Sequence, residues 1–475
     1  MKKFLPLLIA ATLLLQLLLT AQAAENSAQA PDLISRSAIL MDADTGQVLF
    51  DKSSFEIMYP ASMTKIMTAL IISESASPDE IMTVSQSALA ITEPRSANIA
   101  LVVGEEITVA DALYALMLPS ANDAANVLAE HVAGGQHTFA NMMTERARRI
   151  GATNTRFENS HGLHEPGHFT TAYDMALITR HAMQNTEFMR YFGAARHTMD
   201  PTNLQPEPRN FTNFQHMLVP GTHWYHPDVT GGKVGFTHPA RHTMSSSATR
   251  DGRTLIAVVM YSYNSWEKFQ DTAALFEYGF DNFTPFTLEA GLFDIIDIPA
   301  IQDGNQVGNV SFYQPDDVTL LLPAGTDPNN LIIRYLYPDR FEVINERPTG
   351  LAIVELETGD GIFQELLTLG MRHEIIIYEP SQPVFGGELT QVGSRILAII
   401  PAWLFRSILW GVVIFAALFV FVLVLRGVSI RKRRRARMAR LEKARSASLN
   451  PSPASFRSSS TYQLDNRYKK NSRRL

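Results

Sequence analysis

Residues 230–237 read TGGKVGFT, and this short stretch lies about halfway along a chain of 475 residues. Three glycines surround a lysine and a β-branched valine, which is typical of a strand whose backbone approaches another group closely. A lysine on a strand is most often an exposed side chain. With Gly235 beside it, however, Lys233 can line one wall of a cleft, and what lies across that cleft depends on two stretches further upstream.

The segments on either side of this stretch predict an α+β fold. Residues 36–53, RSAILMDADTGQVLFDKS, have the pattern of a β-hairpin that turns at 44–46, and strand-like sequence returns from Val229 onward. Between them, residues 60–190 carry apolar side chains at helical spacing. Strands first and last, with helices between them, predict an antiparallel sheet shared by both ends of the domain and a helical cluster beside it. We expect this domain to span 32–284.

The helical part contains start signals. Thr108 precedes VADALYALM, Ser120 precedes ANDAANVLAEH, and Thr170 or Thr171 precedes AYDMALITRHA. Serine and threonine are favoured helix N-caps, because their side-chain oxygen accepts a hydrogen bond from a free backbone N–H group. We therefore expect helices to begin near these places, and a further helix within SWEKFQDTAALFEYGFDNF, residues 265–283.

After residue 284 the sequence changes to short strands separated by turns, such as DVTLLLPAG and LIIRYLYP. It holds no cluster of His, Asp and Ser that would suggest chemistry. We expect a separate all-β domain at 285–385 that acts as a spacer or pedestal.

The N-terminus has the composition of a targeting segment. Residues 1–23 join a charged start, an apolar run and the small-residue pattern AQA, which is typical of a secretory signal peptide. We expect cleavage after Ala23, with Ala24 as the alternative.

The C-terminus predicts a membrane anchor. Residues 403–426 include 19 consecutive uncharged residues, 407–425, enough to span a bilayer as one transmembrane helix. From Arg426 onward the chain holds 16 Lys and Arg against two acidic residues, and such an excess marks the cytoplasmic side. We expect localisation in the cell membrane, with the domains outside and the basic tail at 427–475, expected to be disordered, inside.

The charge and the cysteine content exclude several classes of protein. The net charge is −6, but the chain without its tail (+14) and without Lys2 and Lys3 is near −22. An acidic ectodomain argues against nucleic acid as a partner, and contact with anionic lipid explains the basic tail. The chain has no cysteine, so a cysteine nucleophile and a Cys-ligated metal are excluded.

The first candidate for chemistry is YPASMTKIMTAL, residues 59–70. Ser62 and Lys65 are three residues apart at the start of a helix, so both project from one face. A serine needs a base to take its proton, and a lysine can serve once burial or a second cation lowers its pKa from about 10.4. A serine beside a helical lysine is also common on solvated helix faces, so this pair alone is a weak signal.

The second candidate is SAN, residues 120–122, which lies between two predicted helices. Ser120 can simply cap the following helix. Alternatively, Ser120 relays protons while Asn122 positions Lys65 and the substrate amide. By itself this short stretch does not separate the two interpretations.

Together the three stretches form a more specific pattern. In chain order they are Ser62-x-x-Lys65, Ser120-x-Asn122 and Lys233-x-Gly235, a motif set of penicillin-binding proteins and class A β-lactamases. The chain resembles the serine D-Ala-D-Ala carboxypeptidases, the low-molecular-mass penicillin-binding proteins that trim peptidoglycan stem peptides. AILMDADTGQVLFDKSS, LMLPSANDAANVLAEH and FENSHGLHEPGHFTTAYDMALITRH are also similar to that family. The resemblance covers residues 36–285, and the β-rich part is similar in position and texture to the family's second domain.

The resemblance implies a penicillin-binding or β-lactamase-like transpeptidase fold and a role for each acylation residue. Ser62 would be the acylated nucleophile and Lys65 its general base. Lys233 would lower the pKa of Lys65 by like-charge repulsion. Ser120 would pass the proton to the leaving D-alanine, and Asn122 would position Lys65 and the substrate.

The resemblance also implies how the substrate is held. The backbone N–H groups of Ser62 and Phe236 would form the oxyanion hole, and Gly235 would allow close backbone approach. Lys233 and Thr237 would help to bind the terminal carboxylate of the stem peptide. Water would then hydrolyse the acyl-enzyme without a cofactor, and β-lactams would be covalent inhibitors.

One position departs from the family pattern. The third motif usually has a threonine where this chain has Val234. Valine has nearly the same shape but no hydroxyl, so a charge-assisted hydrogen bond worth about 1.5–3 kcal/mol would be lost. We expect an active enzyme that holds the terminal carboxylate less firmly, with Thr237 as the remaining hydroxyl.

Three other interpretations stay open at this point. HGLHEPGH places His161, His164 and His168 at spacings that zinc ligands can have, but in a Gly/Pro loop where the family uses the segment structurally. A β-lactamase would need a further base for deacylation, and Glu158 is the nearest carboxylate in chain order. A peptidoglycan-binding membrane protein with weakened catalysis is the third, and the retained Ser62 and Lys65 argue against it.

Overall fold

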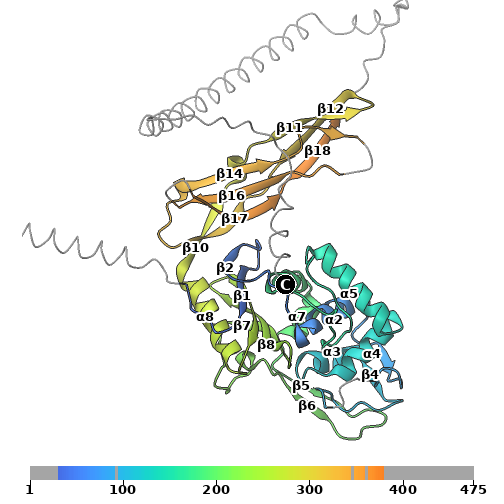
Figure 1. Cartoon of the computed structure of the whole chain (residues 1–475). Coiled ribbons are helices and arrows are strands. Elements are labelled where there is room, and N and C mark those ends of the chain that lie inside the picture. The colour runs from blue at the N-terminus through green and yellow to red at the C-terminus, as the bar shows by residue number, and fades with distance from the viewer. Residues whose placement is uncertain (1–29, 91–94, 344–346, 359–361, 379–475) are drawn as a thin grey trace, which may run out of the picture. The chain divides into compact units, whose positions relative to one another are not determined.

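The computed structural model describes residues 30–90, 95–343, 347–358 and 362–378 (Figure 1). The expected signal peptide, the expected span at 403–426 and the basic tail lie outside these residues. None of the helices in the described ranges has the length and apolar composition that crossing a membrane requires.

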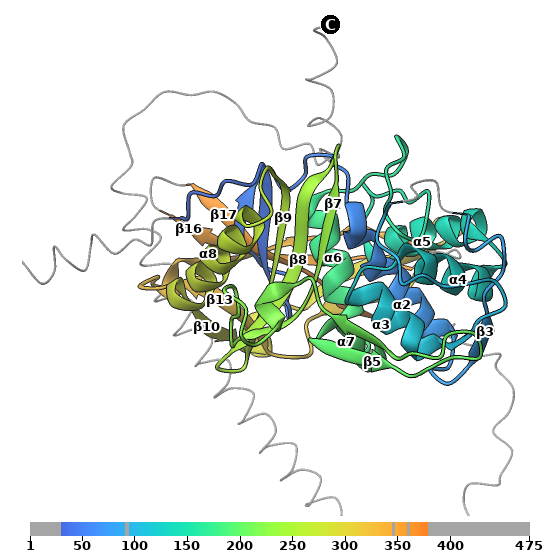
Figure 2. The same ribbon diagram turned by 90° about the horizontal axis from the view of Figure 1, so that it is seen from below.

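A five-stranded antiparallel sheet organises the first domain. In spatial order its strands are β2 (Val48–Lys52), β1 (Ser37–Asp42), β9 (Arg253–Ser262), β8 (Arg241–Arg250) and β7 (Val229–Thr237). Leu40 in β1 lies opposite Ala257 in β9, so the N-terminal hairpin and the late strands share one sheet, as the sequence predicts. The stretch TGGKVGFT lies in β7, which is the edge strand (Figure 2).

Both faces of this sheet are covered, and for this reason β1 is buried along its whole length. Successive strand residues point to opposite faces. Ile39 and Met41 join the core on the helical side, whereas Ala38 and Leu40 join a second core with α8 (Glu267–Asn282). Figure 2 shows α8 on one side of β7–β9 and α2, α3 and α6 on the other.

The helical cluster lies where the apolar spacing predicts it. Its members are α2 (Lys65–Ser75), α3 (Val109–Met117), α4 (Asn122–Ala133), α5 (Gln136–Ile150), α6 (Ala172–Ala182) and α7 (Thr186–Phe192). The Thr108 side chain accepts a hydrogen bond of 3.0 Å from the backbone N–H of Asp111, and Thr171 accepts one of 3.0 Å from Asp174. Both predicted threonine caps are confirmed, and Thr171 rather than Thr170 is the second cap.

The interpretation of Ser120 as a helix cap is wrong. Helix α4 begins at Asn122 after Ala121, with no side-chain cap. Ser120 instead has a left-handed backbone with φ of 65°, which L-residues other than glycine adopt rarely. Its side chain therefore has no capping duty.

Short elements complete this domain. They are η1 (Ala61–Thr64), η2 (His216–Leu218), the pair β3 (Ile81–Thr83) and β4 (Glu106–Thr108), and the pair β5 (Arg196–Met199) and β6 (Arg209–Thr212). Only η1 takes part directly in the candidate site.

From Phe283 onward the described chain is almost entirely β (Figure 1). Its strands are β10 (Phe283–Leu288) with β13 (Val318–Pro323); β15 (Phe341–Glu342), β11 (Ile296–Gln302), β12 (Asn305–Tyr313) and β18 (Arg372–Ile377); and β14 (Leu331–Leu336), β16 (Leu351–Glu357) and β17 (Phe363–Gly370). Two 3₁₀ turns, η3 (Ala290–Leu292) and η4 (Pro328–Asn330), lie between strands. These strands enclose an apolar core of their own, which includes Ile298, Val310 and Leu320.

Candidate active site

The nucleophile candidate lies on the short turn η1, directly before α2. Ala61 at its start has φ of 49°, and its carbonyl accepts a 2.8 Å hydrogen bond from the Thr64 hydroxyl. Ala61, Met63 and Thr64 are buried, whereas Ser62 is partly exposed. The turn therefore presents the Ser62 hydroxyl to solvent and hides its neighbours.

Lys65 is fully buried beside this serine. Its Nζ lies 3.2 Å from Oγ of Ser62 and donates to Oδ1 of Asn122 at 2.6 Å and to the carbonyl of His161 at 2.7 Å. Burial holds the pKa of Lys65 well below its usual value, the charge of Lys233 lowers it further, and Asp123 opposes this shift. A lysine kept neutral at this distance can take the serine proton.

Lys233 is the second buried lysine of the site and is 1% exposed. Burial lowers its pKa to about 7, and its Nζ donates to the carbonyl of Val234 at 3.1 Å. The predicted electrostatic influence of Lys233 on Lys65 is therefore present in the structure.

Strand β7 approaches the nucleophile turn at Gly235. A Cβ atom at this position would lie 2.7 Å from the backbone nitrogen of Ser62 and 2.6 Å from Oγ1 of Thr243. Thr243 in turn donates to the carbonyl of Pro60 at 2.9 Å. Glycine is required because the two backbones touch here, and the contact brings β7, with Phe236 next to Gly235, against the turn that carries Ser62.

Ser120 has the features of a polar group that awaits a ligand. Its residue is 5% exposed, and its Oγ has no hydrogen-bond partner in the structure. Of the predicted residues, Ser62, Lys65 and Asn122 are joined by hydrogen bonds, Lys233 acts on them electrostatically, and Ser120 bonds to none of them. Thr237 lies two residues beyond Gly235, at the end of β7.

The segment HGLHEPGH supports the nucleophile turn. Nε2 of His168 lies 2.8 Å from the Thr64 hydroxyl, and Nδ1 of His168 accepts a 3.2 Å hydrogen bond from the backbone N–H of Glu158. Because Nδ1 accepts, Nε2 carries the proton and donates to Thr64, which donates to Ala61. Burial lowers the pKa of His168 to about 3, so this chain of hydrogen bonds persists at neutral pH.

This segment does not have the arrangement of a metal site. His168 uses both ring nitrogens, and Nδ1 of His161 accepts a 3.1 Å hydrogen bond from Leu163. Among the residues that the structure describes, no group of three or more His, Asp or Glu side chains could hold a metal ion.

The sequence analysis missed three contributors to the site. The His161 carbonyl holds Lys65, Thr64 links His168 to the turn, and Thr243 ties the turn to β8. A backbone carbonyl leaves no side-chain signature. The one usable signal was Gly162, whose φ is 86° and whose Cβ would lie 1.9 Å from the Ala61 carbonyl oxygen.

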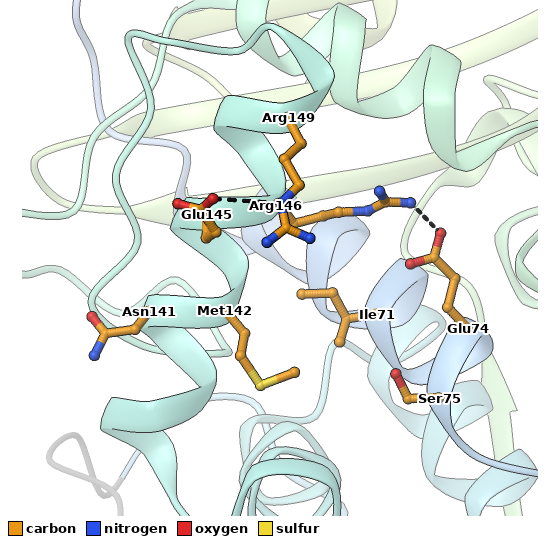
Figure 3. Close-up of a pocket in the computed structure, with 8 residues that line it drawn as sticks. All are labelled: Ile71, Glu74, Ser75, Asn141, Met142, Glu145, Arg146 and Arg149. Carbon is orange, nitrogen blue, oxygen red and sulfur yellow. Dashed lines mark hydrogen bonds and ion pairs between the residues drawn. The ribbon is translucent and has the colours of Figure 1, made fainter. Parts of the chain in front are cut away.

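A hollow of about 450 Å³ between α2 and α5 is separate from this site (Figure 3). Ile71 and Met142 form its apolar part, and Glu74 pairs with Arg146 across it. None of the candidate site residues lines it, so it takes no part in the chemistry.

A partly exposed serine beside a buried lysine, with a second buried lysine on an edge strand, defines an acyl-transferring serine enzyme on an α+β scaffold. Comparison with known proteins agrees with this class. Residues 24–264 match the model of the D-alanyl-D-alanine carboxypeptidase family, peptidase family S11.

Individual relatives extend this match. D-alanyl-D-alanine carboxypeptidase DacF of Bacillus subtilis (strain 168) is 30% identical over 292 residues, which are 60% of this chain and 72% of the relative. Penicillin binding protein 6B from Escherichia coli is 26% identical with a TM-score of 0.55, over 73% of this chain and 97% of that one. Penicillin binding protein 5 from Haemophilus influenzae shares the fold with a TM-score of 0.57, at 24% identity over 73% and 98% of the two chains.

The chain belongs to the family of serine-type D-alanyl-D-alanine carboxypeptidases, hydrolases of the bacterial cell wall. Proteins of this family act on peptidoglycan peptides and bind β-lactams. The predicted family, enzyme class and core fold are thereby confirmed.

Proposed function

We propose that Ser62 attacks the carbonyl of the penultimate D-alanine while Lys65 takes its proton. The observation that carries this assignment is the 3.2 Å separation of Ser62 Oγ and Lys65 Nζ, with Lys65 fully buried. A bond forms between Oγ and the carbonyl carbon, and the amide bond to the terminal D-alanine breaks. The proton on Lys65 reaches the leaving amine through Ser120, whose free hydroxyl supports this role. Water then hydrolyses the ester and releases the shortened peptide.

The substrate is held along β7 in this proposal. The backbone N–H groups of Ser62 and Phe236 stabilise the oxyanion, supported by the close approach at Gly235. Lys233 attracts the terminal carboxylate, and Asn122 keeps Lys65 aimed at Ser62. Thr237 contacts the substrate further along the strand.

We also propose the cellular setting that the chain termini predict. Removal of residues 1–23 and a single span at 403–426 would hold the catalytic domain, 32–284, outside the cell membrane with the basic tail in the cytoplasm. The β-rich domain, 285–385, then acts as a spacer between the membrane and the active site.

Two other functions remain as alternatives with less support. A β-lactamase needs a base for rapid deacylation, but the Glu158 carboxylate is paired with Arg156 at 2.7 Å. A binding protein without catalysis has no use for a lysine that is kept neutral beside a serine.

Labelled penicillin and a D-Ala-D-Ala peptide together test the proposal. We expect stable covalent labelling and release of D-alanine, both abolished by Ser62→Ala. Rapid turnover of penicillin would favour the β-lactamase, and the absence of labelling would favour the binding protein. Matched loss in Lys65→Met, with Lys52→Met active, would support the assignment of the base.

A further inference from the structure

An arginine and two tyrosines form a rim at the end of the sheet next to the acyl site. Arg241, the first residue of β8, lies opposite Thr237 across the β7–β8 turn. Its guanidinium lies 5.9 Å from the ring centre of Tyr263, and that ring lies 5.6 Å from the ring of Tyr261. We call Arg241, Tyr261 and Tyr263 the arginine rim. Tyr263 is 62% exposed, so the rim is open to a ligand.

The rim lies on the same sheet face as the nucleophile turn. Thr243, which holds the Pro60 carbonyl, is two residues beyond Arg241 and therefore points to the same face. Gly235, opposite Thr243, is the residue that touches Ser62. Two residues of a strand span about 6.6–6.8 Å, so the rim begins one strand repeat from the acyl site.

The charge of Arg241 is uncompensated. Its Nε is buried without a hydrogen-bond partner, and within the described residues the guanidinium makes no ion pair. The nearest comparable cation, Arg36, is paired with Glu56. Glu267, close to this end of the sheet, accepts from Asn264 instead, at 2.6 and 2.9 Å. An arginine in this state suits a carboxylate, which it can bind through two parallel hydrogen bonds.

The backbone of the rim is held in an uncommon conformation. Arg241 has φ of 55° and Tyr261 has φ of 63°, in a region that bulky residues rarely adopt. Tyr261 lies where the register between β8 and β9 shifts, and such bulges re-aim side chains next to active sites. Strain at two adjacent positions points to side chains that are held in place for use.

The direction of the substrate decides which part of it reaches the rim. Lys233 precedes Gly235 on β7, and the rim lies beyond it. If Lys233 takes the leaving carboxylate, the acyl part of an extended peptide must run along the edge strand toward the β7–β8 turn. We propose that Arg241 and Tyr263 form a subsite for a carboxylate carried on a side chain of that acyl part. This inference rests on the proposed function and adds a substrate preference to it.

Two substrates that differ only in charge test the subsite. They are N-acetylated tripeptides X-D-Ala-D-Ala, in which X is 2-aminopimelate or its side-chain amide. We expect wild-type kcat/KM to be at least about tenfold higher for the carboxylate, because a charge-assisted pair is lost with the amide. The ratio should fall as salt is raised, since the rim is open to solvent.

Variants of the rim separate binding from folding. We expect Arg241→Gln to bring the ratio of the two kcat/KM values to about one, and Arg241→Gly, which suits the left-handed backbone, to do the same. Penicillin labelling of Ser62 counts the active sites in each preparation. Tyr263→Leu should lower the ratio about two- to fivefold through loss of the cation–π contact. Arg196→Gln, on exposed β5, is the matched control and should keep the wild-type ratio.

Each outcome has a defined meaning. Equal hydrolysis of both peptides by the wild type would overturn the subsite and leave the proposed function intact, as would a ratio that survives both Arg241 variants. Hydrolysis of neither peptide would overturn the proposed function and the subsite together.

Discussion

Lys233 should destabilise the fold that it serves, and Lys233→Met tests this expectation. The lysine is buried, and its pKa falls from 10.5 to about 7. This difference corresponds to roughly 5 kcal/mol of unfavourable free energy for the charged form in the fold. Methionine keeps most of the aliphatic length but loses the hydrogen bond to the Val234 carbonyl, at a cost of about 1 kcal/mol. Allowing for partial solvation of the charge, we expect a gain in stability of about 2–4 kcal/mol, even though activity is lost.

The pH dependence has a definite sign. Below about pH 7 the lysine is charged in both states, so the wild type bears the full cost of burial. Between about 7 and 10.5 the unfolded chain binds more protons than the folded one, and wild-type stability rises with pH. The advantage of Lys233→Met should therefore be largest at acidic to neutral pH and shrink as pH approaches 10.

Thermal unfolding at pH 6.5 and 9.5 measures this difference. For a domain of this size, 2–4 kcal/mol raises Tm by about 5–15 °C. Lys52→Met removes one positive charge from the half-buried edge strand β2 and should give no such gain. The reasoning fails if Lys233→Met is no more stable than the wild type at pH 6.5, or if its advantage is the same at both pH values.

Three further substitutions probe the walls of the site. Thr64→Val removes the hydroxyl that accepts from His168 and should lower the free energy of unfolding by about 1–3 kcal/mol in urea titrations, whereas Thr64→Ser should cost clearly less; equal losses would contradict the hydrogen-bond chain. Gly235→Ala should reduce penicillin acylation at least about 100-fold, because its Cβ would lie 2.7 Å from the Ser62 nitrogen; unchanged labelling would show that the two backbones can separate freely. Val234→Thr should change KM for a D-Ala-D-Ala peptide by less than about threefold, because Val234 packs against the core that contains α8. A tenfold or larger fall in KM would instead support a missing hydrogen bond to the terminal carboxylate.

The elements of the catalytic domain could be predicted because local signals fix them. The pattern VTGGKVGFT gave the whole of β7, from Val229 to Thr237, and the threonines at 108 and 171 marked two helix starts. Strand alternation and capping act over a few residues, so one sequence is enough to read them. The pairing of Ser62 with Lys65 followed for the same reason, since three residues on a helix bring two side chains to one face.

The parts of the site that could not be predicted depend on contacts between distant segments. Lys65 is held by the His161 carbonyl, 96 residues away, and Thr64 meets His168 across 104 residues. Neither contact has a local pattern. Ser120 was compatible with a cap, and only the fold shows that its backbone turns left-handed before Asn122 and frees its hydroxyl. The rim is similar, because a register shift at Tyr261 decides where Arg241 and Tyr263 meet.

The unfavourable features of the domain are concentrated around one location. Ala61 and Ser120 have left-handed backbones at two motifs of the site, and Lys65 and Lys233 are buried cations with lowered pKa values. Left-handed residues cost about 1–2 kcal/mol each, and a buried cation costs more. A site of this kind persists only if its surroundings over-determine it. Here the sheet is covered by an apolar core on each face, and Gly235 locks the edge strand against the nucleophile turn. Substitutions that relieve the strain should therefore stabilise the protein and weaken catalysis, whereas substitutions in the two cores should lower stability before they alter the chemistry.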